Sequence, residues 1–453
     1  MHLNNLRIFS FVLALVIALT SITMASAQRR GISVVRDAEI EALVKDYARP
    51  LMKAAGLRQG SVAFHIVNSN EFNAFVTGRD MFIHTGLLLQ SKTPNEVIGV
   101  IAHELGHIKG GHIVRLAERA EAASKIARIS TLLGIGLGAA GAAAGNGDAA
   151  SAGIGVATGG HSIALRSIRA YQREEEEAAD RAAATYLRKS GQSGAGMLRT
   201  FKKLSDNIAI QAGRIDPYLL SHPMPRERIT SLSALLRGSR HFNKKDSPAL
   251  QKRHDMARAK IAAYVGGSRY AQSLLAGKEL VPDARLYGRA IVAYLYGSPK
   301  KALPLIEKLS KKNPKNAYLH EMRGEILLRT GKGAKAAQAF RKAITLDRYK
   351  AGFIRVELGH ALLESGSKTA TKQAIIELKK GLARDPTAVG GFQYLARAYG
   401  ETGDIPNALL ASAEFAMRTG RRNQAKAYAK RAKQGFKRGS PGWLRADDIT
   451  QIK

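Results

Sequence analysis

The sequence contains no cysteine among its 453 residues. Disulfide bonds and thiolate metal ligands are therefore excluded, and any transition-metal site must be built from histidine and carboxylate side chains. An oxidising compartment is permitted by this absence but is not demonstrated by it.

Acidic residues are scarce: 36 Asp and Glu stand against 71 Lys and Arg, which gives a net charge of +35. Such a field favours anionic partners, including nucleic acid and anionic lipid. The basic residues are spread from Arg29 to Lys453, however, with no zinc finger or RNA-binding signature. We therefore expect no primary role in nucleic-acid binding, and we expect the charge to tune association with surfaces, including peripheral contact with an anionic membrane.

Long hydrophobic runs are also few, and the first of them is too short for a bilayer span of ~20 residues. Arg7 precedes the apolar run 8–22, and Ala25-Ser26-Ala27 follows it. This order predicts a cleavable signal peptide over residues 1–27 and hence a secreted protein. An uncleaved membrane anchor is the alternative. Lipoprotein anchoring is excluded because no cysteine follows the run.

The first 110 residues predict a helix, a small antiparallel sheet and a second helix. Apolar residues recur at helical spacing over 37–55, and β-branched and aromatic residues fill 61–67 and 74–85, with turn residues between them. Thr93 and Pro94 then begin a largely apolar helix.

Small residues dominate the segment 131–161, which is interrupted by Gly145-Asn146-Gly147-Asp148. Neither half reaches the length of a transmembrane span. Two interpretations stay open: a helical hairpin packed through its small residues, and a hairpin that touches a membrane.

Glycines and alanines recur at a period near 34 residues in the C-terminal half. Around the turn glycine Gly331 stand Gly324, Ala336, Phe340 and Ala343, and equivalent turn glycines lie 34 residues earlier, 35 residues later and 37 residues beyond that, at Gly297, Gly366 and Gly403. This pattern resembles the tetratricopeptide repeat, whose stacked helical hairpins form a superhelical scaffold with a concave face for partners. A generic helical bundle is the alternative.

The strongest chemical motif is His103-Glu104-Leu105-Gly106-His107. On a helix with ~3.6 residues per turn the two imidazoles lie on one face, so both can bind one ion, with Glu104 beside them. A chance motif with hydrogen-bonded histidines is the alternative. A catalytic zinc takes three protein ligands, so a carboxylate from another part of the chain is needed.

Four adjacent carboxylates, Glu174 to Glu177, precede Asp180 in the segment 171–180. Spacing alone does not choose among the four. Glu176 and Asp180 are separated by four residues and share a helical face, which favours Glu176.

Together these residues resemble the gluzincin peptidases of the HtpX and CAAX prenyl-endopeptidase type. The family frame matches Arg173, Glu176 and Ala179-Asp180, and it implies that Glu176 is the third zinc ligand and that Asp180 orients a ligand histidine. Glu174, Glu175 and Glu177 are then expected to be solvated. His65, His84, His112 and His161 are expected to be structural.

The resemblance extends to two further segments. Asn73, Ala74 and Phe75 begin a stretch that looks like the family's strand before the zinc helix, and an edge strand there can pair with an extended substrate. Ser221-His222-Pro223 resembles the family's His-Pro segment, which implies that His222 is a movable gate at the zinc.

The fold class expected is an α+β zinc metallopeptidase domain, mostly helical with a small antiparallel sheet, followed by an all-α tetratricopeptide-type superhelical domain. The expected division is 1–27 signal peptide, 28–235 peptidase, 236–280 helical linker, 281–440 repeats and 441–453 tail.

With its leader, this combination is similar to bacterial periplasmic proteases that act in outer-membrane protein quality control. It implies a periplasmic endopeptidase with one Zn²⁺ per chain and Glu104 as general base. Its expected substrates are misfolded or stalled envelope proteins, and its expected partners are outer-membrane β-barrel proteins or their assembly machinery. The main alternative is a chaperone that docks such a machine through its repeats, with latent protease activity.

Overall fold

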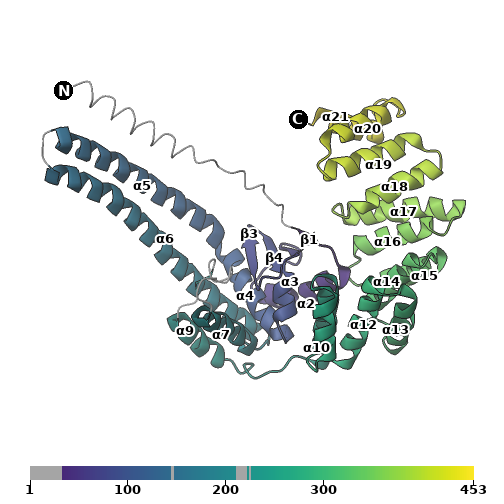
Figure 1. The fold of residues 1–453 in the computed structure, drawn as a ribbon, viewed down its shortest axis with the longest axis horizontal. Coiled ribbons are helices and arrows are strands. Elements are labelled where there is room, and N and C mark those ends of the chain that lie inside the picture. The colour runs from purple at the N-terminus through teal and green to yellow at the C-terminus, as the bar shows by residue number, and fades with distance from the viewer. Residues whose placement is uncertain (1–32, 144–146, 211–221, 224–225, 453) are drawn as a thin grey trace.

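The computed structural model describes residues 33–143, 147–210, 222–223 and 226–452, so the predicted signal peptide 1–27 and Ser221 lie outside the described residues. A mixed α/β part is followed by a curved array of helical hairpins (Figure 1). The first part begins with β1 (Val34–Val35), α2 (Ala38–Ala54), β2 (Ala63–Val67), β3 (Ala74–Thr77), β4 (Asp80–His84), α3 (Thr85–Gln90) and α4 (Pro94–Gly110). Among the described residues, no helix combines the length and the apolar character that a bilayer crossing needs.

The sheet has four strands in the order β1-β2-β4-β3 and is mixed, not wholly antiparallel as predicted. β1 pairs antiparallel with β2, and β3 pairs antiparallel with β4, but β2 and β4 are parallel. The turn at Gly78, which has a φ of +60°, reverses the chain from β3 into β4. β4 then pairs with β2, so β3 is left at the edge of the sheet.

Helix α4 is buried on nearly every side because apolar residues occur all around its circumference. Pro94 occupies its first turn, and Gly111 ends it in the left-handed region with a φ of +69°. Gly106 has a structural role within the chemical motif: a Cβ there would lie 2.9 Å from the backbone of Ala179. The glycine therefore allows the helix that carries the acidic segment to approach α4 closely.

Two long helices, α5 (His112–Ala143) and α6 (Gly147–Lys189), form a hairpin that extends from the body of the molecule (Figure 1). A Cβ on Gly153 would lie 2.4 Å from the backbone nitrogen of Gly138 and 2.5 Å from the carbonyl oxygen of Gly134. The predicted packing through small residues is therefore present. The C-terminal half of α6 lies against α4.

Between the hairpin and the repeats, the described part of the chain forms the helices α7 (Ala195–Ile210), α9 (Arg226–Arg237), α10 (Pro248–Tyr264) and α11 (Gly267–Ala276). Helix α10 lies in the segment expected as a linker, yet most of it is buried. Nε2 of its His254 donates to the Ser91 carbonyl oxygen at 2.9 Å, and Nδ1 accepts from the Tyr47 hydroxyl at 2.9 Å. α10 also packs against α12 and so joins the core of the first part to the repeats.

The array consists of paired helices: α12 (Pro282–Tyr296) with α13 (Pro299–Lys312), α14 (Ala317–Arg329) with α15 (Gly333–Leu346), α16 (Gly352–Leu363) with α17 (Lys368–Arg384), α18 (Gly390–Glu401) with α19 (Ile405–Arg418), and α20 (Arg422–Gln434) with α21 (Pro441–Gln451). Gly331 adopts a φ of +73° at its turn. A Cβ on Gly324 would lie 2.8 Å from the ring of Phe340, which explains the small residue at that repeat position. The segment expected as a tail contains α21, which packs on α20.

Candidate metal centre

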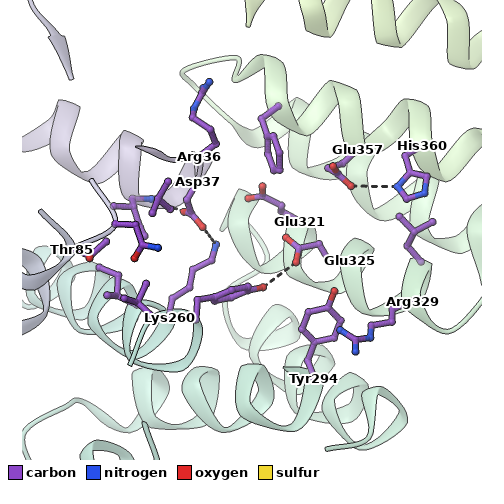
Figure 2. Close-up of a pocket in the computed structure, with 18 of the residues that line it drawn as sticks. Arg36, Asp37, Thr85, Lys260, Tyr294, Glu321, Glu325, Arg329, Glu357 and His360 are labelled. Atoms are coloured by element: carbon purple, nitrogen blue, oxygen red, sulfur yellow. Dashed lines mark hydrogen bonds and ion pairs between the residues drawn. The ribbon is translucent and has the colours of Figure 1, made fainter. Parts of the chain in front are cut away.

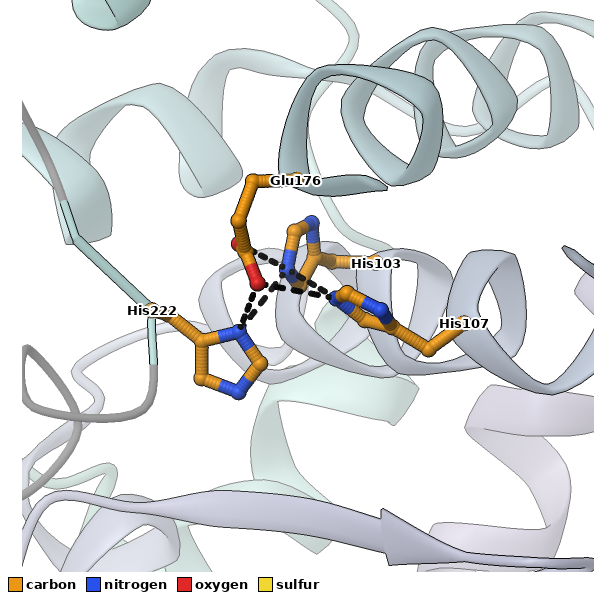
Figure 3. Close-up of side chains that lie close together, drawn as sticks. All are labelled: His103, His107, Glu176 and His222. Atoms are coloured by element: carbon orange, nitrogen blue, oxygen red, sulfur yellow. Dashed lines mark hydrogen bonds and ion pairs between the residues drawn. The ribbon is translucent and has the colours of Figure 1, made fainter. Parts of the chain in front are cut away.

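Four side chains far apart in the sequence converge at one buried place (Figure 3). His103 and His107 come from α4, Glu176 from α6, and His222 from the segment before α9. One ligand-type atom from each lies within 4.8 Å of the others. This is the only group of three or more His, Cys, Asp or Glu within the described ranges that is compact enough to hold one ion.

The two histidines of the motif direct the same ring nitrogen toward the centre. His103 Nε2 and His107 Nε2 are 3.0 Å apart, and they lie 3.2 Å and 3.4 Å from the two oxygens of Glu176. On its other side, His103 Nδ1 is 3.0 Å from Asp180 Oδ1. A proton on Nδ1 satisfies that bond and leaves the Nε2 lone pair for a metal.

His107 is oriented by a chain of hydrogen bonds that sequence reasoning missed. Its Nδ1 lies 2.9 Å from His112 Nδ1, and His112 Nε2 lies 2.6 Å from Glu175 Oε2. One consistent proton arrangement has His107 donating to His112 and His112 donating to Glu175, which again leaves Nε2 of His107 unprotonated.

The expectation that Glu175 is solvated is therefore wrong, and His112, which was expected to be structural, links Glu175 to the ring of His107. Both side chains are largely buried at the centre, because α5 turns back beside α6 and brings them together. The sequence did place His112 directly after Gly111, which ends the helix of the His-Glu-x-x-His motif, and this position was the signal for a contact with His107. Glu177 is exposed as expected, and the side chain of His161 lies outside the described residues.

Arg228 on α9, which follows the His222-Pro223 segment in the sequence, contacts both carboxylates of the site. Its Nε donates to Asp180 Oδ2 at 2.7 Å, and its Nη1 lies 2.8 Å from Glu176 Oε2. Nη1 also donates to the carbonyl oxygen of Pro223 at 2.8 Å. The guanidinium thus fixes both carboxylates and the backbone next to His222.

Burial and mutual charge shape the electrostatics of the centre. Burial alone would lower the pKa of His103, but its hydrogen bonds with Asp180 and Glu176 outweigh burial and raise that pKa to about 9. Burial and the neighbouring His103 hold the pKa of His107 well below its usual range. Burial would raise the pKa of Glu176, but His222 and His103 hold it well below normal. The carboxylate of Glu176 is therefore held in its charged form beside the imidazoles of His103 and His222.

Glu104 lies beside the cluster and is fully buried. Neither of its carboxylate oxygens has a hydrogen bond within the described part of the chain. Burial raises its pKa, and the nearby His222 and His103 oppose that rise. His222 reaches between the carboxylates: its Nδ1 is 2.8 Å from Glu176 Oε1 and its Nε2 is 3.6 Å from Glu104 Oε1.

These donors fit zinc. Two imidazole nitrogens bound to one tetrahedral zinc at 2.0–2.1 Å lie about 3.3 Å apart, close to the 3.0 Å between the Nε2 atoms here. A proton on one of the two rings can bridge this pair, and a zinc ion bound by both nitrogens would take the place of that proton. Imidazole and carboxylate are also the ligand set that remains for zinc without cysteine.

The predicted substrate-strand residues lie apart from the cluster. Asn73 and Ala74 are buried, and Phe75 stacks on Phe82 with ring centroids 4.8 Å apart. Ala74 and Phe75 belong to β3 at the sheet edge, which packs beside α4.

A buried helix bearing His-Glu-x-x-His, with a carboxylate supplied by a second helix, defines a metallopeptidase site. Residues 35–236 match peptidase family M48. This region is therefore an M48 metallopeptidase domain, and helical repeats of tetratricopeptide type follow it. M48 peptidases typically depend on zinc.

Known relatives match most of the chain. A putative beta-barrel assembly-enhancing protease from Vibrio cholerae is 26% identical over 429 residues, which cover 92% of this chain and 85% of the relative. The beta-barrel assembly-enhancing protease of Escherichia coli is 24% identical over 393 residues, with 85% and 77% coverage. A protease HtpX homolog from Nitrosomonas europaea is 34% identical over 127 residues, which cover 26% of this chain and 42% of the relative.

Proposed function

We propose that one zinc ion per chain, held by His103, His107 and Glu176, makes this protein an endopeptidase. The observation that carries the proposal is the convergence of two Nε2 atoms and one carboxylate at a buried point. Zinc at this position would supply a Lewis acid that polarises the scissile carbonyl and makes water nucleophilic near neutral pH. We further propose the division 28–235 peptidase, 236–280 helical linker, which contains the buried helix α10, 281–440 repeats, and 441–453 tail, which contains α21.

Glu104 is the proposed general base. It takes a proton from the attacking water and returns it to the leaving amine, which requires hydrogen-bond reach to both. Its buried carboxylate has no hydrogen bond to another described residue, so both oxygens are available for this transfer. Asp180, held by Arg228, keeps the ring of His103 in the orientation and tautomer that expose Nε2.

The test is zinc content and casein cleavage by purified residues 28–453. About one zinc per chain, cleavage abolished by a chelator and restored by added zinc, would support the proposal. A protein that retains no zinc after dialysis would contradict it and would favour a repeat-based adaptor with a degenerate peptidase fold.

His222 is the proposed gate. In the present arrangement it occupies space between Glu176 and Glu104, where an attacking water and a substrate carbonyl would have to enter. In an open arrangement its imidazole can donate a hydrogen bond to the developing oxyanion.

We expect His222→Ala to raise the rate of casein cleavage by about tenfold or more, since a minor open state is typically 0.1–10% populated. The readout is initial rate at equal zinc content. His241→Ala is the control, because His241 pairs with Arg240 and is not part of the cluster. A loss of cleavage in His222→Ala would contradict gating. It would mean that His222 acts only by donating a hydrogen bond to the developing oxyanion.

The edge position of β3 supports a role in substrate binding. We propose that an extended substrate pairs with the backbone around Asn73, Ala74 and Phe75. The unpaired edge of β3 and its packing beside α4 are what support this.

For the biological role we propose a periplasmic protease that removes misfolded or stalled envelope proteins during outer-membrane protein quality control. The support is the two assembly-enhancing proteases that match most of the chain. The second candidate is a chaperone that docks β-barrel proteins or their assembly machinery through its repeats. A Glu104→Gln protein that still restores outer-membrane assembly in a strain lacking the natural protein would favour the chaperone.

We also propose that the tip of the α5–α6 hairpin makes peripheral contact with an anionic membrane. Between Arg128 and Arg166 the sequence has a single charged residue, Asp148. Large apolar side chains there are exposed, up to 71% for Leu132, and include Ile129, Leu132, Leu133, Ile135, Leu137, Val156, Ile163 and Leu165. Basic residues border this apolar tip on both helices: Lys125, Arg128, Arg166, Arg169 and Arg173.

The double variant Leu132→Ser/Leu133→Ser is expected to weaken binding to vesicles containing phosphatidylglycerol by about tenfold or more, because two exposed leucines no longer enter the lipid. Co-sedimentation measures the binding. Ile376→Ser, an exposed apolar position on α17, is the matched control. Equal binding by the double variant and the unmodified chain would rule out the hairpin as the contact.

A further inference from the structure

A cavity of about 690 Å³ lies between the first part of the molecule and the inner face of the repeats (Figure 2). One wall is formed by the chain around Arg36 and Asp37 and by the end of α10 at Lys260. The opposite wall belongs to α14 and α16. This volume falls within the ~300–1,000 Å³ range of ligand pockets, and it exceeds what one side chain fills.

The repeat wall is acidic in a protein whose net charge is +35. Glu321 and Glu325 project from α14 and Glu357 from α16 into the same space (Figure 2). Glu321 is 2% exposed, and its Oε2 has no hydrogen-bond partner among the described residues. Buried, unpaired carboxylates are costly, so their grouping here calls for an explanation.

The acidic groups have few partners of their own. Across the described ranges, neither Glu321 nor Glu325 forms an ion pair; Glu325 accepts a hydrogen bond of 3.2 Å from the Tyr264 hydroxyl. Glu357 lies 3.7 Å from the Nδ1 of His360. Burial raises the pKa of Glu325 to about 7 and that of Glu321 well above its usual range, and the charge of Lys260 opposes this rise without cancelling it.

The cations that line the cavity already have partners other than Glu321 and Glu325. Lys260 Nζ lies 2.6 Å from Asp37 and 3.4 Å from Glu39. Arg36 is paired with Asp385 and with Glu41. Arg329 lies over the ring of Tyr294, 5.0 Å from its centroid. The carboxyl groups of Glu321 and Glu325 are therefore available to a ligand cation, whose charge would favour their ionised form.

We propose that this cavity binds a lysine or arginine side chain of a polypeptide segment that enters between the two parts of the protein. The carboxylates accept hydrogen bonds from the ammonium or guanidinium group, which are stronger than bonds between neutral groups. Aromatic rings on the lining, from Tyr264, Tyr294, Phe353 and Tyr394, offer apolar contact and cation–π attraction.

A metal ion is a poorer occupant than a side chain. Within the described ranges, the cluster at His103 is the only set of three or more ligand-type residues compact enough for one ion. The acidic groups of the cavity are thus too widely spaced for a shared ion. A guanidinium, with five donors in a planar fork, spans such a spacing.

The test uses residues 28–453 carrying Glu104→Gln, so that no peptide is cleaved. Binding of a fluorescent ten-residue peptide with two arginines is measured by anisotropy and compared with the same peptide in which citrulline, a neutral isostere, replaces arginine. We expect the arginine peptide to bind about tenfold or more tightly. Equal affinity of the two peptides would overturn the proposal.

The second part of the test measures binding of the same two peptides to protein variants. Glu321→Gln/Glu325→Gln is expected to abolish the preference for arginine without lowering Tm, because neither carboxyl group forms an ion pair with another described residue. Glu307→Gln is the matched control, since Glu307 on α13 pairs with Arg323 at 3.3 Å and does not line the cavity. An arginine preference unchanged in the double variant would place the recognition elsewhere and refute the proposal. Neither result depends on whether the chain cleaves peptides.

Discussion

Glu104→Gln is expected to reduce casein cleavage by about 10²–10⁴-fold, the usual contribution of a positioned general base. Zinc content should stay near one per chain, because His103, His107 and Glu176 are unchanged. Glutamine has nearly the same shape as glutamate but cannot take a proton from water at neutral pH. The readouts are initial cleavage rate and zinc by elemental analysis of the same sample.

The structure adds a reason to expect a stable variant. Glu104 is fully buried and neither of its oxygens has a hydrogen bond within the described part of the chain. Removing its charge relieves a desolvation cost, so the melting temperature should be unchanged or higher. Glu118→Gln, at an exposed position on α5, is the control. Cleavage retained by Glu104→Gln would exclude Glu104 as the base.

Glu176→Gln is expected to weaken zinc binding by about 100-fold or more and to abolish cleavage with it. Substitution of a residue that only orients a metal ligand typically lowers metal affinity by 10–100-fold. Substitution of a ligand itself should lower it by at least as much. The measurement is zinc affinity by competition with a chromophoric chelator. Glu177→Gln is the matched control one residue away, because Glu177 is 59% exposed and pairs only with Arg181 among the described residues.

The comparison separates a local metal effect from a general loss of structure. Glu176 also pairs with Arg228, so circular dichroism must show that the variant is folded. Equal zinc affinity in Glu176→Gln and Glu177→Gln would remove Glu176 from the ligand set. Glu175→Gln is expected to fall between them, because Glu175 reaches the metal centre only through His112.

Helical periodicity accounts for most of what the sequence predicts well. His103 and His107 lie on one face of a helix because their spacing is close to one turn, and burial of that helix follows from its apolar residues. The repeats are predicted for a similar reason: Gly324 faces Phe340, and only a small residue leaves room for the ring. Both inferences rest on contacts within one helix or between consecutive helices.

The parallel pairing of β2 with β4 was not predicted. Short strands joined by turns suggest antiparallel neighbours, but β3 pairs only with β4 and stays at the edge. Which strand occupies the centre depends on how α4 and α2 cover the sheet, and strand spacing in the sequence carries no such information.

The sequence by itself determined the chemistry available: no thiolate, a His-Glu-x-x-His pair on one helical face, and a carboxylate-rich helix later in the chain. Only the tertiary structure decided which groups the neighbouring carboxylates contact. Glu176 faces the histidines, Glu175 reaches His112, and Glu177 is exposed, because successive residues on a helix point ~100° apart and α6 presents one side to α4. The positions of Arg228 and His222, and the acidic cavity, likewise depend on contacts between distant segments, which no local pattern encodes.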